Sequence, residues 1–429
     1  MDYASLPEEG MTRAEIESVF DQLRTADKDG RTSFSERWLN DRGLLLDDGA
    51  LEVAKAAHIA FFTKNNSHSV IMGLERELVS WVLNLLNAEH GAAGTLTSGG
   101  SESLFLATAA ALVNFQATHD FDTPCEAVIP ETGYPTFEKY SRYLGYTVRR
   151  VPVDENFRAV PEFIDEAITD RTFMILGSFT SWAHGACDPI PAMAEVATAR
   201  NVWLHVDACV GGMLAPFARD LGREIADFDF SVPGVSSISV DFHKYGYSSK
   251  GVSGVFFRHH ELSADQPFSF DDWAAGLYRS PVFTGTRSGG AIASAWAVAR
   301  YLGREGYKRR TTQVLKARDS IVDAVNVNPD IKLLGEADIG TVAIGSDRID
   351  ISAVSSSLNG MGWAVNNLKN PDGIQLVLGP IKDIYIDFFV DDLQKAVEEV
   401  KANRANLSKT DVVYSDEVVR GPGSIFGDG

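Results

Sequence analysis

Short apolar runs alternate with helical patterns through the middle of the chain, and this alternation constrains the fold more than any other feature. The runs EAVIP, TVRRVPV, RTFMILGSF and VWLHVDA, which start at residues 126, 147, 171 and 202, are separated by the helical patterns TFEKYSRYLG, PEFIDEAI and AMAEVATAR. Apolar runs joined by helices are typical of crossover connections between parallel strands. The sequence therefore predicts an α/β fold with a mostly parallel sheet that is covered by helices on both faces.

The flanking regions complete the expected domain organisation. SISVDFHK (237–244) and GVSGVFFR (251–258) are expected to be later strands of the same sheet, and residues 11–27 and 48–63 have helical spacing. A long helix from about residue 290 leads into a smaller α+β region, with candidate strands IKLLG, TVAIGS, IQLVLG and IYIDFFV. We therefore expect an N-terminal helical segment (1–60), a large domain (61–305), a small C-terminal α+β domain (306–410) and a loosely held tail (411–429).

Composition narrows the classes of partner. The 429 residues carry a formal net charge of −20, which disfavours nucleic acid and anionic membranes as partners. The three cysteines have no metal-ligand spacing, and their odd number favours reduced thiols in a cytoplasmic protein. The acidic start of the chain is no signal peptide, and no stretch reaches the roughly 18 apolar residues that a spanning helix needs. We expect a cytoplasmic protein that binds no metal.

A glycine turn at the start of a helix is the first candidate site. TSGGSES, residues 97–103, follows an apolar segment and precedes an Ala/Leu-rich helix. Two glycines let backbone amides approach an anion closely, and the helix start adds the positive end of its dipole, so the turn is typical of a phosphate cradle. The alternative is an ordinary helix start that is capped by Ser101 or Ser103.

Three further motifs bear polar groups at the ends of expected elements. HVDA ends a strand at Asp207, and SVDFHK places His243 and Lys244 directly after another strand. Burial would lower the pKa of Lys244 and free its amine to form an imine. GTRSGG places Arg287 before paired glycines, where it would meet an anion. Taken singly, each has a plain alternative, namely a loop carboxylate, a solvated lysine or a turn that leads into the next helix.

The combination of motifs points to pyridoxal 5′-phosphate. An amine holds the aldehyde of this cofactor as a Schiff base, a carboxylate keeps its pyridine nitrogen protonated, and a cradle anchors its phosphate. The chain offers these groups in the order TSGGSES, HVDA and HK. Together they predict an enzyme that uses pyridoxal phosphate.

The same motifs carry a resemblance to a known family. The chain resembles the fold-type-I enzymes called group II decarboxylases, and most closely their sphingosine-1-phosphate lyase branch. The resemblance rests on HKYGYSSKG, HVDACVGGMLAPF, GSFTSWAHGACDPI, DWAAGLYRSPVFTGTRSGG and LERELV, and it runs from about residue 60 to 310. It implies a large domain with a mostly parallel seven-stranded sheet and a homodimer with shared active sites.

The resemblance also implies roles for individual residues. Lys244 would form the Schiff base and move protons at the substrate, and Asp207 would pair with the pyridinium nitrogen. The other residues that it assigns to the cofactor site are Gly100, Ser101, Glu102, His184, His205, Ala208, His243 and Thr286. Of these, His205 is also a catalytic candidate, although its side chain would serve equally well to satisfy buried backbone. Those that it assigns to the substrate are Tyr247, Lys250 and Arg287.

The sequence departs from the family pattern in several places. Tyr134, within TGYPTF, stands where the family usually has a histidine that stacks on the cofactor, and a phenol shuttles protons less readily near neutral pH. The family's NPLHP segment is reduced to NNSH, which makes His68 a substrate-side candidate. An N-terminal loop tyrosine is absent, with Phe34 or Trp38 as replacements, and we expect no membrane anchor of the eukaryotic kind.

Two reactions fit these residues. A bond held perpendicular to the cofactor ring breaks, so loss of a carboxylate gives a decarboxylase, whereas cleavage of a β-hydroxy amine between its α- and β-carbons gives a retro-aldol lyase. The HKYGYSSKG loop favours the lyase, because Lys250 would bind a phosphate or similar anion as a point charge. A catalytically silent binding protein is the third hypothesis, and the presence of Lys244 and Asp207 counts against it.

Overall fold

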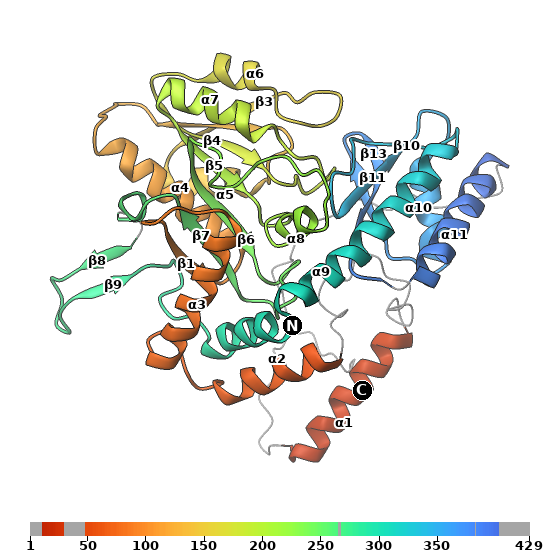
Figure 1. Ribbon diagram of the computed structural model, residues 1–429, viewed down its shortest axis with the longest axis horizontal. Coiled ribbons are helices and arrows are strands. Elements are labelled where there is room, and N and C mark those ends of the chain that lie inside the picture. Colours follow the sequence, from red (N-terminus) through yellow and green to blue (C-terminus); the bar gives the residue numbers. More distant parts are fainter. Residues whose placement is uncertain (1–10, 30–47, 265–266, 382, 403–429) are drawn as a thin grey trace, which may run out of the picture.

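A computed structural model describes residues 11–29, 48–264, 267–381 and 383–402. A seven-stranded sheet forms its centre, in the order β1-β7-β6-β5-β4-β2-β3 (Figure 1). The strands are β1 (Ala93–Thr97), β2 (Glu126–Pro130), β3 (Thr147–Val151), β4 (Thr172–Ser178), β5 (Trp203–Asp207), β6 (Val235–Asp241) and β7 (Ser253–Phe257). β7 runs antiparallel to β1 and β6, and the remaining neighbours are parallel. The expected seven-stranded, mostly parallel sheet is confirmed.

Alternate residues of each strand enter separate cores on the two faces of the sheet. Val128 of β2 packs in one core, whereas its neighbours Ala127 and Ile129 pack in the other. The second core also contains α4 (Gly100–Gln116) and α5 (Thr136–Leu144), and the first contains α3 (Ser69–Leu85), α6 (Pro161–Ala167), α7 (Ile190–Arg200) and α8 (Ala215–Asp220). Both faces are therefore covered, which explains why β2, β4 and β7 are buried along their whole length.

A second, smaller sheet lies C-terminal to α9 (Gly289–Val327), and this helix runs from the large sheet to the smaller one (Figure 1). Its backbone breaks at Gly303, two residues before the domain boundary that we expect at 305, and that boundary stays a prediction. The antiparallel sheet has the order β10-β11-β13-β12, from β10 (Lys332–Leu333), β11 (Thr341–Gly345), β12 (Asn366–Lys369) and β13 (Asp372–Val377). It packs with α10 (Ile351–Gly360), as expected for a small α+β domain.

One candidate strand is wrong. IYIDFFV (384–390) lies in the helix α11 (Asp383–Lys401), whose buried residues Ile386, Phe389, Leu393, Ala396 and Val397 recur at helical spacing. The seven-residue window is dense enough in apolar residues to resemble a strand, and the helical period shows only when it is followed to 397. β12 was not predicted, because its residues Asn366–Lys369 carry a weak apolar signal at the sheet edge.

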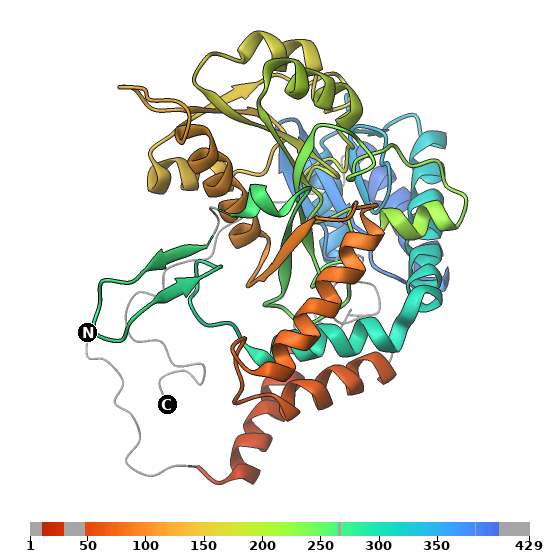
Figure 2. The ribbon, with the colours of Figure 1, turned by 60° about the vertical axis from the view of Figure 1, so that its left-hand side comes forward.

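The remaining elements lie around the large sheet. α1 (Arg13–Asp29) and α2 (Asp48–Ala60) confirm the helical spacing near the N-terminus, and the short helix η2 (His260–Ser263) follows β7. The hairpin of β8 (Phe268–Phe270) and β9 (Tyr278–Ser280), which the sequence did not predict, extends away from the body of the molecule (Figures 1 and 2). Among the described helices, none has the length and apolar character to cross a membrane.

Candidate active site

A polar cavity of about 180 Å³, the inner cavity, lies at the carboxyl ends of β4, β5 and β6. This edge of a parallel sheet is where α/β proteins bind ligands. The start of α4 forms one wall, and the loop after β6 forms another. The residues that line the cavity are Gly100, Ser101, Leu104, Tyr134, Ser178, Thr180, Trp182, Asp207, Cys209, Val210, Asp241, His243, Lys244 and Lys250.

Lys244 is mostly buried in the inner cavity and is held by a carboxylate. Its Nζ lies 2.9 Å from Oδ2 of Asp241, and its side chain is 16% exposed. Burial lowers the pKa of the Lys244 ammonium, but the negative charges of Asp241 and Asp207 raise it by more, and the net shift is upward. The expectation of a lowered pKa is therefore wrong, because two buried carboxylates outweigh the loss of solvent.

Asp241 is a site residue that our sequence analysis missed. Its carboxylate faces Lys244, accepts a hydrogen bond from Ser253 Oγ at 2.5 Å and lies 3.6 Å from Nε2 of His243. Burial raises the pKa of Asp241, but Lys244, His243 and Ser253 lower it by more, so the carboxylate stays ionised. Its place at the end of β6, three residues before Lys244, was the signal that could have identified it.

Asp207 ends β5 and lines the same cavity. Its Oδ1 accepts a hydrogen bond from the backbone N–H of Cys209 at 3.1 Å, which fixes the carboxylate at the turn after the strand. Burial raises the pKa of Asp207, and the charge of Lys244 reduces that rise only partly. The next residue, Ala208, is fully buried and belongs to the core below. A carboxylate in such a setting is suited to a cationic partner.

The turn before α4 forms the wall that we predicted to be a cradle. A Cβ added to Gly100 would lie 2.9 Å from Asp241 Oδ1 and 3.0 Å from Cys209 Sγ, so only glycine fits there without a shift. The serine-capped alternative is wrong, because Gly99 is the N-cap and no side chain caps the helix. Ser103 instead bonds to Thr97 and Ser253, while Ser101 lines the cavity.

Glu102 lies behind this wall and does not line the cavity. Its carboxylate accepts hydrogen bonds from the backbone N–H and hydroxyl of Ser98, at 2.6 and 2.7 Å, and from the backbone N–H of Thr284, at 3.0 Å. Glu102 therefore ties the loop before α9 to the turn before α4. Glu102 thus stabilises two loops at the edge of the site.

His243, Tyr134 and Lys250 complete the inner cavity. Nδ1 of His243 lies 3.0 Å from the carbonyl oxygen of Val252, and burial lowers the pKa of the imidazole. Tyr134 is half-buried, and Lys250 is exposed at the rim. The structure thus brings these three residues together with Lys244 and Asp207, as the sequence predicted.

His205 and Tyr247 lie outside the inner cavity. His205 is fully buried in β5, with its ring nitrogens 2.7 Å from Ser237 Oγ and 3.1 Å from Ser239 Oγ, and burial lowers its pKa to about 3. The ring is thus held by two serine hydroxyls, and not by the buried backbone that we gave as the alternative for His205. Tyr247 is buried near Tyr245 and Tyr307, in a left-handed backbone conformation with φ 58°.

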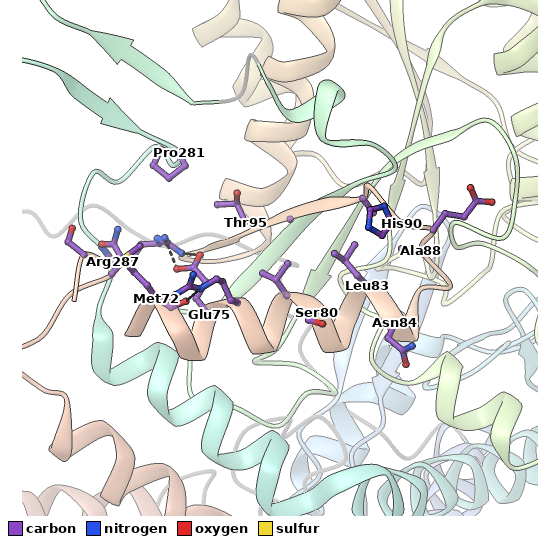
Figure 3. Close-up of a pocket in the computed structure, with 17 residues that line it drawn as sticks. Met72, Glu75, Ser80, Leu83, Asn84, Ala88, His90, Thr95, Pro281 and Arg287 are labelled. Carbon is purple, nitrogen blue, oxygen red and sulfur yellow. Dashed lines mark hydrogen bonds and ion pairs between the residues drawn. The ribbon is translucent and has the colours of Figure 1, made fainter. Parts of the chain in front are cut away.

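Arg287 lines another cavity, of about 760 Å³, which we call the α3 groove, and Thr286 and His68 are not among the residues that line it. Figure 3 shows Arg287 beside Glu75 on α3, with Pro281 above it at the same end of the groove and His90 near the other end. The guanidinium lies 2.6 Å from Glu75 Oε1 and donates to the carbonyl of Leu96 at 2.7 Å, and its side chain is 7% exposed.

Thr286 and His68 do not line the inner cavity either. Thr286 is exposed on the loop before α9, and His68 is the N-cap of α3 without a side-chain capping bond. The predicted contacts of Thr286, Arg287 and His68 with cofactor or substrate are therefore not seen among the described residues. They stay predictions, as do Phe34, Trp38 and the tail 411–429, which lie outside the described residues.

A cavity of about 670 Å³, the outer cavity, adjoins the inner one. Both are lined by Tyr134 and Trp182, so these two rings separate them. His184 lines the outer cavity and is not among the residues of the inner one, although the resemblance implies contact with the cofactor. Its ring stacks on Phe157 with centroids 3.8 Å apart.

The inner cavity fits pyridoxal phosphate. It offers an amine on Lys244, a fixed carboxylate on Asp207 and a helix start where only glycine is accommodated. Thr180 also lines the cavity, and its buried Oγ1 has no hydrogen-bond partner in the described chain. A buried polar atom of this kind is normally satisfied, and a ligand in the cavity would do so.

Comparison with known proteins identifies the same family. The family model described as pyridoxal-dependent decarboxylase conserved domain matches residues 49–345. A sphingosine-1-phosphate lyase of Arabidopsis thaliana is 38% identical over 78% of this chain and 62% of its own length. A probable sphingosine-1-phosphate lyase of Legionella pneumophila is 32% identical over 92% of this chain and 70% of its own length. The chain thus spans less than two thirds of the Arabidopsis relative.

Solved structures agree with the fold. A sphingosine-1-phosphate lyase of Burkholderia pseudomallei superposes with a TM-score of 0.88 at 32% identity, over 94% of both chains. A glutamate decarboxylase of Lactobacillus brevis, at 20% identity, has a TM-score of 0.79 over 93% of this chain and 95% of its own. The fold-type-I prediction is confirmed.

Proposed function

Because the chain belongs to the pyridoxal-dependent decarboxylase family, in its sphingosine-1-phosphate lyase branch, we propose that it is a carbon–carbon lyase. Its cofactor is the pyridoxal phosphate of the family. The substrate is an anionic β-hydroxy amine, for which phosphate is one candidate anion, and the products are an aldehyde and a smaller amine. The observation that carries this proposal is the presence of Lys244 and Lys250 in one cavity.

Lys244 has two tasks in this reaction. Its amine must be unprotonated to react with a carbonyl group, and Asp241 Oδ2, at 2.9 Å, holds the amine in position at the inner cavity. Bound pyridoxal phosphate supplies an electron sink for the bond that breaks at the substrate's α-carbon. Lys244 then returns a proton to that carbon, while the proton of the β-hydroxyl leaves as the aldehyde forms.

Four groups would hold the cofactor. Asp207 would pair with the ring nitrogen, and Ala208 and Tyr134 would pack against the ring. Gly100, Ser101 and His243 would bind the phosphate at the start of α4, where the helix dipole favours an anion. The place of these residues around the inner cavity, with Ala208 buried next to Asp207, supports the assignments that the family resemblance implies.

Lys250 distinguishes the lyase from a simple decarboxylase. Its ammonium lies at the rim of the inner cavity, which suits a phosphate or carboxylate that the substrate keeps throughout the reaction. A substrate anchored there presents its bond to the β-carbon for cleavage. Tyr134 lies at the same cavity and is the group that we assign to the proton of the β-hydroxyl.

A homodimer with shared sites forms part of the proposal. The hairpin of β8 and β9 exposes large apolar side chains: Phe268 is 61% exposed, Trp273 52%, Leu277 69% and Phe283, just beyond it, 71%. Exposure of this density marks an interface. Pro281 and Arg287, which line the α3 groove, flank the loop with Thr286 and follow the hairpin in the chain, so a second copy seated there would receive these residues.

A substrate panel tests the function. The purified protein is expected to absorb near ~420 nm, and borohydride is expected to remove the band and label Lys244. Anionic β-hydroxy amines should release an aldehyde without carbon dioxide, and Lys244→Ala should lower this rate by roughly a thousandfold or more. Carbon dioxide from amino acids without aldehyde would establish the decarboxylase instead. A colourless protein that takes up no cofactor would contradict both.

A further inference from the structure

The outer cavity contains polar atoms that the chain leaves unsatisfied. Both ring nitrogens of His184 and Oγ1 of Thr132 are buried, and none of the three has a hydrogen-bond partner in the described chain. His184 is 6% exposed, and both residues line the cavity. Buried polar atoms are nearly always hydrogen-bonded in folded proteins, because an unmade bond leaves the cost of desolvation uncompensated. These atoms therefore indicate a place for a polar ligand group.

The ring of His184 is held in position by its neighbours. It stacks on Phe157 with an interplanar angle of 6°, and Phe157 has a left-handed backbone with φ 61°, which bulky residues seldom adopt. Burial lowers the pKa of His184 to about 4, so the imidazole is neutral at pH 7. A neutral imidazole offers one donor and one acceptor, which matches a hydroxyl group.

Charge in the outer cavity disfavours an anion. Among the described residues that line it, Arg150 is the one with a permanent positive charge. Its guanidinium is committed to the carboxylate of Glu138, at 2.7 Å, and to the carbonyls of Pro130 and Gly133, at 2.7 and 2.8 Å. The exposed carboxylate of Glu131 lies at the same cavity. A neutral group is therefore favoured there over a phosphate or carboxylate.

The two cavities divide a substrate between them. The amine must reach Lys244, and the anionic group is placed at Lys250, both in the inner cavity. The remaining substituent extends past the shared rings of Tyr134 and Trp182 into the outer cavity. That cavity, at about 670 Å³, falls within the roughly 300–1,000 Å³ of small-molecule sites.

We propose that the outer cavity binds the aldehyde-forming part of the substrate, and that His184 and Thr132 select a part that carries a hydroxyl group. This inference rests on the proposed function and adds the substrate class: a β-hydroxy amine whose leaving aldehyde is hydroxylated, in preference to one with a plain alkyl chain. A site built to hydrogen-bond a hydroxyl rejects analogues that lack it, because its polar atoms are then left unpaired.

Binding measurements on the cofactor-loaded enzyme test this selection. The probes are 2-aminoalkyl phosphates of increasing chain length, each made with a methyl end and a hydroxyl end. They lack the β-hydroxyl and cannot undergo retro-aldol cleavage, so the cofactor absorbance reports binding alone. At the chain length that reaches His184, the hydroxyl-ended probe should bind about tenfold more tightly than its methyl-ended partner.

Variants assign the effect to particular atoms. His184→Phe keeps a ring that stacks on Phe157, and it should reduce the ratio of the two affinities to about one. Thr132→Val, which removes one hydroxyl, should reduce the ratio in part. His119→Phe is the matched control, because His119 also stacks on a phenylalanine, Phe115, with centroids 4.1 Å apart, but is exposed and away from both cavities.

The outcomes separate this inference from its premise. Equal affinities for the two ends at every chain length, or an unchanged ratio in both His184→Phe and Thr132→Val, would overturn the role of the outer cavity and leave the lyase proposal intact. If no probe of either kind perturbs the cofactor band, anionic amines do not bind, and both proposals fall. Thr132→Val changes one atom, so it keeps the test decisive if His184→Phe does not fold.

Discussion

Two long helices of the large domain, α4 and α9, each begin at a turn with paired glycines. Of these two turns, only the one before α4 lines the inner cavity. The turn before α4 lines that cavity through Gly100 and Ser101. At the turn before α9, Arg287 forms an ion pair with Glu75. The hydroxyl of Ser288 caps the helix, because it accepts a hydrogen bond from the N–H of Ala291. A helix start is available to an anion only where the chain itself does not satisfy it.

Removing the arginine tests the α9 side of this comparison and should have the largest effect. Arg287→Met leaves the carboxylate of Glu75 without its partner at a site where that side chain is 15% exposed. We expect the free energy of unfolding to fall by about 3 kcal/mol, measured by urea denaturation at fixed protein concentration. Adding Glu75→Gln should recover part of the loss.

The control for this variant is an exposed ion pair. Arg304→Met breaks a pair with Asp220 in which the arginine is 57% exposed, and it should cost about 0.5 kcal/mol. If Arg287→Met instead leaves stability unchanged and reduces absorbance near ~420 nm, Arg287 contacts a cofactor, and the contrast between the two turns is contradicted.

Filling the glycine tests the α4 side. Gly100→Ala would place a Cβ 2.9 Å from Asp241 Oδ1, and Asp241 is already fixed by Lys244 and Ser253. We expect cofactor affinity to fall by about tenfold, measured by absorbance titration. Gly99→Ala is the matched control, because its Cβ meets nothing within 4 Å, and it should bind the cofactor normally. Equal losses in the two variants would argue against a cradle at Gly100.

A pair of serine variants should give the smallest effects. One variant should change the free energy of unfolding, and the other should change the affinity for the cofactor. Ser288→Ala removes the cap of α9 and should lower the free energy of unfolding by about 1 kcal/mol without changing cofactor affinity. Ser101→Ala removes no cap and should weaken cofactor binding severalfold at unchanged stability. Thermal unfolding and absorbance titration of both proteins measure the two effects. A stability loss in Ser101→Ala would restore the capping alternative.

The alternation of strands and helices could be predicted, because the apolar pattern that distinguishes a strand from a helix lies in residues that are close in sequence. β4 and β7 are continuous apolar runs, and the residues that end β5 and β6 must then lie at one edge of the sheet. Asp207 and Lys244 could be placed in one site for this reason. The strand assignment of 384–390 failed where the decisive spacing lay outside the window.

The sequence by itself determined the mostly parallel sheet, the amine on Lys244, the carboxylate on Asp207 and the glycine turn between β1 and α4, because local periodicity and strand order fix them. Tertiary structure alone decided which charges meet. Arg287 pairs with Glu75, 212 residues away, and Asp241 raises the pKa of Lys244 although burial alone would lower it. It also decided that His184 lies beside the outer cavity. Electrostatic and hydrogen-bond energies depend on distance and burial in the folded chain, and these are properties of packing rather than of sequence spacing.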